Sequence, residues 1–307
     1  MARRIAFGTL MIAVIGGALY LDWVLGLECR PGSPLHMLPT AVVLLVLVVL
    51  GYSELTRLAA AAGVGLLGVS GLVFSAALAT IVHWGPLVQS LSAPGVLDRP
   101  ATIGHWSPLV QVPDIPYATV LVMAYLPAAL LAMFVEQMVR HKVEMAFQRV
   151  GATLLATMYL GLGGFFILAI RSEGVPWLVV FLAAVKFTDI GAYFTGSAIG
   201  RHKIIPWLSP GKSWEGLAGG LVVGAGAAML AMRLLLGRAI TPSTVIWAVA
   251  VGLAGQFGDL CESLLKRSAN LKDSGALVPE FGGVLDIIDS PLLAAPVAMW
   301  LWWLLHP

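Results

Sequence analysis

Long apolar stretches separated by short polar connections dominate the chain. A transmembrane helix needs about 20 mostly apolar residues, and the pattern predicts nine such segments. They run over residues 5–27, 37–58, 62–83, 118–139, 150–170, 175–198, 214–236, 243–262 and 288–305. We therefore expect an all-α, polytopic integral membrane protein, a bundle of about nine transmembrane helices. The first segment also resembles a signal peptide, but its length favours an uncleaved span.

The stretch over residues 84–117 interrupts this pattern. It contains six prolines and three glycines, residue types that punctuate regular structure. We expect a long irregular connection there, on the outer side of the membrane.

Composition agrees with a lipid environment. Hydrophobic residues make up 59% of the 307 positions and charged residues only 11%, whereas soluble proteins have about 25% charged residues. The net charge of +2 gives no reason to expect nucleic-acid binding. Cys29 and Cys261 lie far apart and form neither a metal motif nor a disulfide framework, so we interpret both as packing residues.

Lysine and arginine positions predict the orientation of the spans, because cytoplasmic connections carry an excess of these residues. With the N-terminus in the cytoplasm, nine spans put twelve cations on the cytoplasmic side and five outside, with Lys186 inside a span. We therefore expect a multi-pass protein of the cell inner membrane with its C-terminus outside. The cytoplasmic set is Arg3, Arg4, Arg57, Arg140, Lys142, Arg149, Arg201, Lys203, Lys212, Lys266, Arg267 and Lys272.

Acidic residues of the C-terminal half lie inside or at the edge of apolar segments. A charge at membrane depth costs about 2.5–3.5 kcal/mol on insertion scales and often marks a polar cavity. Lys186 and Asp189 are three residues apart and share a helix face, so they form either a structural ion pair or part of a site. Glu54 and Arg57, in contrast, end the second segment and are interpreted as interfacial charges that anchor a helix end.

Two further segments carry candidate chemistry. Residues 209–213 form a short turn before a predicted helix start, where free backbone N–H groups and Lys212 could cradle a phosphate. A polar stripe of Asp259, Glu262, Ser263, Lys266 and Arg267 follows helical spacing on an otherwise apolar segment.

Asp286 and Asp289 lie three apart at the entrance of the last segment. Taken alone, they equally suit acids that complement a helix dipole. Together with Asp259 they make an oxygen-ligand set of the kind that Mg²⁺ takes beside substrate phosphates. No cluster of histidine or cysteine favours zinc.

These motifs, in this order, resemble the phosphatidate cytidylyltransferases, also called CDP-diacylglycerol synthases. The resemblance covers about residues 186–291. It rests on these runs: 189–194 (DIGAYF), 209–216 (SPGKSWEG), 258–267 (GDLCESLLKR), 272–275 (KDSG) and 282–290 (GGVLDIIDS).

The resemblance implies a membrane enzyme that transfers CMP from CTP to phosphatidate, with Mg²⁺, a possible second cation and a cytoplasmic site. It implies that Asp259, Asp286 and Asp289 hold metal, and that Lys266 acts beside them. Substrate would be bound by Asp189, Ser209, Lys212, Ser263, Arg267 and Lys272. It also implies a homodimer, and a division into N-terminal helices, 1–170, and a catalytic part, 171–307.

The chain departs from the family pattern at two positions. Phe281 and Ile287 stand where the family usually has histidine and arginine. Neighbouring cations could substitute, the lipid phosphate could differ, or activity could be reduced. Two other classes stay open: a divergent or non-catalytic relative, and a transporter in which Lys186, Asp189 and Asp259 line a permeation path.

Overall fold

The computed structural model describes residues 13–25, 37–91, 117–275 and 282–305. Within these ranges the structure is helical apart from isolated bridge residues, such as the pair Lys203 and Ser213. After a short helix, Ala13–Leu25, the elements are α2 (Leu38–Ala61), α3 (Gly68–Leu91), α4 (Tyr117–Arg140), α5 (Ala146–Ala156), the π-helix η1 (Thr157–Leu162), α6 (Gly163–Ser172), α7 (Val175–Ile199), α8 (Trp214–Leu236), α9 (Pro242–Ser268) and α10 (Leu285–Leu305).

The predicted all-α membrane fold is confirmed, and each of the nine predicted segments overlaps a described helix. Six described helices are long and apolar enough to cross a membrane: α2, the continuous helix of α5, η1 and α6, and α7 to α10. The count of nine spans is therefore supported only roughly. Ala13–Leu25 and the Gly68–His83 part of α3 are apolar but shorter.

The largest shift concerns α3. Gly63 has φ +79°, a left-handed conformation that follows the end of α2, and α3 begins only at Gly68. The helix then continues to Leu91, so residues 84–91, which we expected to be irregular, are helical. The rest of that expected connection, 92–116, lies outside the described residues.

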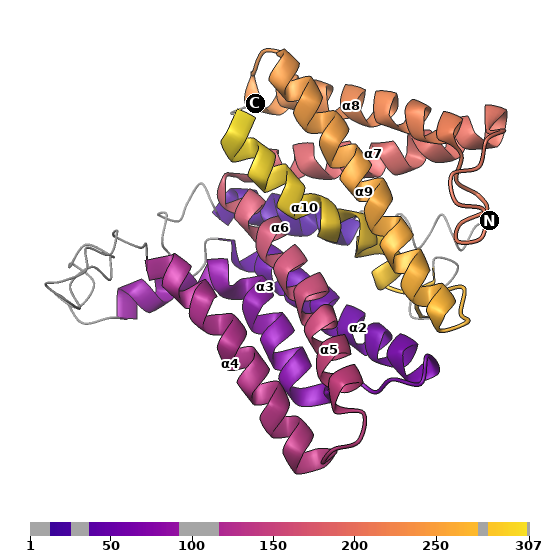
Figure 1. Cartoon of the computed structure of the whole chain (residues 1–307). Coiled ribbons are helices and arrows are strands. Elements are labelled where there is room, and N and C mark those ends of the chain that lie inside the picture. The colour runs from indigo at the N-terminus through magenta and orange to yellow at the C-terminus, as the bar shows by residue number, and fades with distance from the viewer. Residues whose placement is uncertain (1–12, 26–36, 92–116, 276–281, 306–307) are drawn as a thin grey trace, which may run out of the picture.

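The helices form two groups joined by α6. Figure 1 shows α2 to α5 on one side of α6 and α7 to α9 on the other, with α10 between them. One buried apolar cluster contains residues from all five helices α6, α7, α8, α9 and α10, with Phe181 and Val251 among them. A second joins α2, η1 and α10 around Val48 and Leu292. Because α10 contributes to both clusters, it connects the two groups of helices.

A buried ion pair attaches the first described helix to the bundle. Arg171 Nε lies 2.8 Å from Asp22 Oδ2, and both side chains are almost completely buried. The hydroxyl of Thr40 donates to the same carboxylate oxygen. A charge buried in this way is tolerated because it is paired and hydrogen-bonded.

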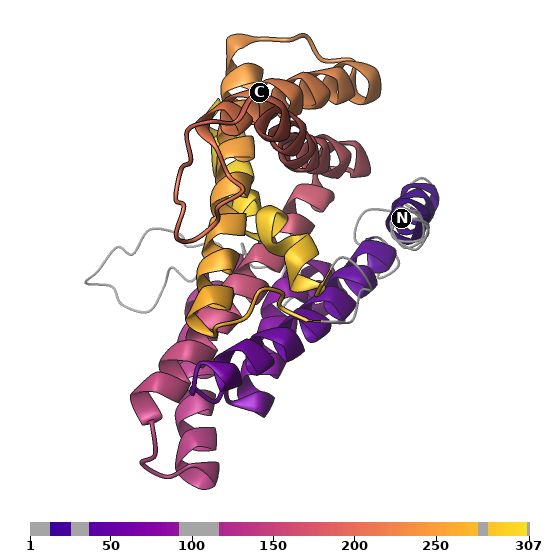
Figure 2. The same cartoon turned by 90° about the vertical axis from the view of Figure 1, so that its right-hand side faces the viewer.

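Close packing of α7 against α8 depends on glycine. The two helices lie side by side in both views (Figures 1 and 2). Gly216, Gly220 and Gly224 recur every fourth residue on α8, the small-residue spacing that brings membrane helices close together. A Cβ on Gly224 would lie 2.7 Å from the carbonyl oxygen of Ala184 on α7. Contact at backbone level therefore fixes the position of α7.

We expect Gly224→Ala to destabilise the protein by about 1–3 kcal/mol, because an added methyl group meets backbone atoms that cannot move independently. Gly226→Ala is the matched control, since a Cβ there meets nothing within 4 Å. Thermal unfolding in detergent should show a lower melting temperature for Gly224→Ala only. Equal melting temperatures for the two variants would contradict this account of the packing.

Candidate functional site

A polar cavity of about 740 Å³ lies between α7, α9, the start of α10 and the segment over residues 200–213. Cavities of this size hold small organic ligands or cofactors. Seven of the ten predicted site residues line its walls: Asp189, Ser209, Lys212, Asp259, Lys266, Asp286 and Asp289. The cavity thus brings together motifs that are separate in the sequence.

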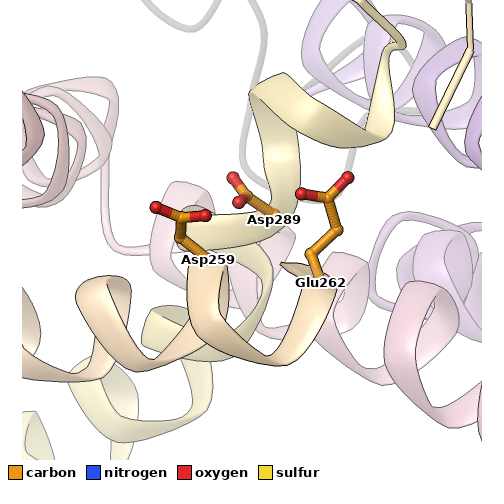
Figure 3. Close-up of side chains that lie close together, drawn as sticks. All are labelled: Asp259, Glu262 and Asp289. Atoms are coloured by element: carbon orange, nitrogen blue, oxygen red, sulfur yellow. The ribbon is translucent and has the colours of Figure 1, made fainter. Parts of the chain in front are cut away.

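Three carboxylates meet where α9 packs against α10. Asp259 and Glu262 come from α9 and Asp289 from α10, and one oxygen of each lies within 4.8 Å of the others. Figure 3 shows the three side chains projecting into the same space. A Cβ on Gly258 would lie 2.8 Å from the carbonyl oxygen of Asp289. Glycine at this position therefore lets the helices approach closely enough for the carboxylates to converge.

This group of carboxylates fits a hard divalent cation. Glu262 is 0% exposed, and its Oε1 has no hydrogen-bond partner among the described residues. A buried, unpartnered carboxylate oxygen is costly, and neighbouring carboxylates also repel one another. Mg²⁺ binds carboxylate oxygens and would relieve both costs. The fit rests on Glu262 in addition to the predicted Asp259 and Asp289.

Two lysines neutralise part of the acidic charge. Lys212 Nζ lies 2.8 Å from Asp259 Oδ2 and also donates to the backbone oxygen of Gln256 at 2.9 Å. Lys266 Nζ lies 2.6 Å from Glu262 Oε2. Both ammonium groups belong to cavity-lining residues, so both can also meet an anionic ligand.

Asp286, for which metal binding stays a prediction, is not one of the three converging carboxylates and pairs with Lys266. Its Oδ1 is 2.5 Å from Lys266 Nζ. Its Oδ2 accepts hydrogen bonds from the backbone N–H of Gly283 at 2.7 Å and from the Ser274 hydroxyl at 2.8 Å. With both oxygens engaged, Asp286 is arranged to orient Lys266.

The expected pair on α7 is present and links three helices. Lys186 Nζ lies 3.4 Å from Asp189 Oδ2 and donates to the backbone oxygen of Ile287 at 2.8 Å. The side-chain amide of Gln256 donates to Asp189 Oδ1 at 2.7 Å. Lys186 therefore places a positive charge beside Ile287, where the family pattern has arginine.

The segment before α8 is folded back by its own polar groups. Ser213 is the N-cap of α8 and accepts a hydrogen bond from the backbone N–H of Gly216 at 3.1 Å. The Glu215 carboxylate accepts from the backbone N–H groups of Arg201 and His202, at 3.1 and 3.2 Å. These bonds hold the start and end of the segment together.

Three predicted residues are not part of the cavity wall. Ser263 donates to Asp259 Oδ1 at 3.4 Å. Arg267 turns to backbone oxygens, reaching that of Leu271 at 3.3 Å. Lys272 is exposed to solvent.

Glu262 and Gln256 line the cavity but were not among the predicted site residues. Glu262 follows Asp259 by three positions on one helix face, which was the available signal. Gln256 precedes Asp259 by three positions but carries no charge, so nothing set it apart.

Comparison with known proteins agrees with the motifs. The model of the cytidylyltransferase family matches residues 2–305. The chain is 36% identical over 155 residues to the phosphatidate cytidylyltransferase of Bacillus subtilis, covering 49% of this chain and 57% of the relative. The enzyme of the same name from Staphylococcus saprophyticus is 33% identical over 156 residues, covering 51% and 60%. The chain thus spans somewhat less than two thirds of the length of these curated relatives.

We expect Asp259→Asn to weaken divalent-cation binding by at least about tenfold, because an anionic oxygen is lost from a group of three. Mn²⁺ binding to the detergent-solubilised protein, followed by electron paramagnetic resonance, measures this change. Glu144→Gln is the control, since that side chain is 73% exposed. Unchanged Mn²⁺ affinity in Asp259→Asn would contradict a cation site.

Proposed function

The chain belongs to the cytidylyltransferase family, and on this premise we propose that it transfers CMP from CTP to phosphatidate, giving CDP-diacylglycerol and pyrophosphate. One observation carries the proposal: three carboxylates and two lysines converge in a cavity among helices long enough to cross a membrane. Such a site suits a polyanionic nucleotide together with a substrate anchored in lipid. The name of the curated relatives supports the choice of substrates.

In this reaction a phosphate oxygen of phosphatidate attacks the α-phosphorus of CTP. The bond from that phosphorus to the oxygen leading to the β-phosphate breaks, and pyrophosphate leaves. The nucleophile is already an anion, so the protein has mainly to position the substrates and neutralise charge. Held by Asp259, Glu262 and Asp289, Mg²⁺ would neutralise and align triphosphate oxygens.

The lysines of the cavity take the remaining negative charge. Lys212 and Lys266 would bind phosphate oxygens, and Asp286 keeps Lys266 in place. Ser209, in the turn before α8, would orient the nucleotide. Lys186 would supply the positive charge that arginine would give at position 287. Roles for Ser263, Arg267 and Lys272 in substrate binding remain predictions, as does any second cation.

We further propose that the site faces the cytoplasm, where CTP is available. The distribution of lysine and arginine supports an inner-membrane protein with its N-terminus inside and its C-terminus outside. Glu54, near the end of α2, contacts Val284 and Leu285, which agrees with both regions lying at one membrane face. The division at residue 170, homodimerisation and the absence of nucleic-acid binding stay predictions.

We expect purified protein to move label from CTP into lipid when phosphatidate and Mg²⁺ are present, and to lose this activity with EDTA. Asp259→Asn and Asp286→Asn should each lower turnover by about 10²-fold or more, since each removes charge aimed at the reacting phosphates or at Lys266. Glu144→Gln should remain active. Thin-layer separation of the labelled lipid measures the activity of each protein, and thermal unfolding checks that each variant is folded.

Other results would redirect the assignment. Folded protein that binds CTP but labels no lipid would indicate a different lipid phosphate or a non-catalytic relative. Protein that binds no CTP would favour the transporter. Full activity in both aspartate variants would contradict the roles given to these carboxylates.

A further inference from the structure

Glu54 lies in α2, far in the sequence from every motif of the site, and was expected to be an interfacial anchor. The structure corrects this interpretation, because Glu54 is only 3% exposed. Its carboxylate accepts hydrogen bonds from the backbone N–H groups of Val284 and Leu285 at 2.9 and 2.8 Å, and the Ser274 hydroxyl lies 3.0 Å from it. A buried carboxylate with hydrogen-bond donors of this kind belongs to the interior of the protein and does not anchor a helix end in water.

The two backbone donors belong to the start of α10. The first N–H groups of a helix have no partner within the helix, and they form its positive end. α10 begins at Leu285, so Glu54 caps it from another helix. Asp286 and Asp289 follow within the next turn, which ties their position to this cap.

A continuous chain of contacts leads from Glu54 to the carboxylate group. Ser274 Oγ lies 3.0 Å from Glu54 Oε2 and 2.8 Å from Asp286 Oδ2. A serine hydroxyl has one hydrogen, so it serves one of these carboxylates at a time. Asp286 then holds Lys266 at 2.5 Å, and Lys266 reaches Glu262 at 2.6 Å.

Two glycines of the motifs make room for this side chain. A Cβ on Gly283 would lie 2.7 Å from Glu54 Cδ, and a Cβ on Gly275 would lie 2.8 Å from the same atom. Any larger residue at either position would displace the carboxylate. The motif segments that end at Gly275 and begin at Gly282 therefore pack directly against Glu54 of α2.

We propose that Glu54 is a positioning residue of the cytidyl-transfer site. It fixes the start of α10 and the Ser274 hydroxyl, so that Asp286 orients Lys266 and Asp289 faces Asp259. Glu54 contacts no substrate in this scheme. The inference rests on the proposed function for its catalytic part, while its effect on the carboxylate group can be measured without turnover.

Glu136 offers a matched control. Its carboxylate accepts from the backbone N–H groups of Ser70 and Val69, at 2.7 and 3.3 Å, and so it too caps a helix from another helix. Its side chain is 8% exposed, and neither Glu136 nor its partners line the cavity. Glu54→Gln and Glu136→Gln therefore remove the same kind of contact at different places.

We expect both variants to lower the melting temperature, but only Glu54→Gln to lower kcat, by roughly 10–100-fold, as is typical when a partner of catalytic ligands is lost. KM for CTP should change less than kcat. Glu54→Gln should also weaken Mn²⁺ binding to the substrate-free protein by about tenfold or more, whereas Glu136→Gln leaves it unchanged.

The outcomes separate this inference from the proposed function. If wild-type protein transfers CMP and Glu54→Gln keeps its kcat and Mn²⁺ affinity, Glu54 is only structural and the inference is overturned. If wild-type protein is inactive, the proposed function fails, and the Mn²⁺ comparison alone decides the inference.

Ser274→Ala provides a second test if Glu54→Gln does not fold. It removes the hydroxyl that lies between Glu54 and Asp286 but keeps the backbone N–H bond of residue 274 to Asp286 and both backbone hydrogen bonds of Glu54. A fall in kcat at an almost unchanged melting temperature supports the chain of contacts, and an unchanged kcat rejects it.

Discussion

The ammonium group of Lys266 lies between two carboxylates from different helices, and the site depends on this arrangement. Glu262 approaches it from α9 and Asp286 from α10, at 2.6 and 2.5 Å. The Lys266 side chain is only 12% exposed, and a charge buried to this extent is stable only when it is paired within the protein. Lys266 therefore fixes the position of α10 relative to α9, and this position also brings Asp289 close to Asp259 and Glu262. The pairing that stabilises the helices is thus also the pairing that forms the site.

Much of this architecture could be predicted from the sequence, because its strongest signals are local. Apolar stretches of about 20 residues gave helices that largely match the observed α2, α4 and α7 to α10. Helical spacing placed Lys186 beside Asp189, and the N-cap position of Ser213 follows from its place before an apolar run. These features require knowledge of one helix only. The start of α3 was missed because Gly63 and Gly65 sit within an otherwise apolar stretch, where hydropathy does not show a break.

Features that depend on two or three helices were beyond sequence reasoning. Spacing places Asp286 and Asp289 on one face of α10, but it cannot say that Asp286 reaches Lys266 while Asp289 reaches Asp259 and Glu262. That difference depends on the closeness of α9 and α10 at Gly258. Glu54 is the clearer case. A charge near the end of an apolar segment usually meets water, and only the fold brings the start of α10 to it.

The contacts of Glu54 also bear on how the two groups of helices cooperate. α10 packs into both apolar clusters, so a movement of α2 relative to the C-terminal helices would displace the start of α10. Glu54 makes that coupling specific, because its carboxylate holds the backbone N–H groups of Val284 and Leu285, the two residues directly before Asp286. A hydrogen bond weakens when its donor and acceptor move apart by a few tenths of an ångström, whereas apolar contacts are non-directional and allow helices to slide past one another. The N-terminal helices thus contribute more than a boundary with lipid: through one buried carboxylate they set the position of acidic and basic groups more than two hundred residues away in the sequence.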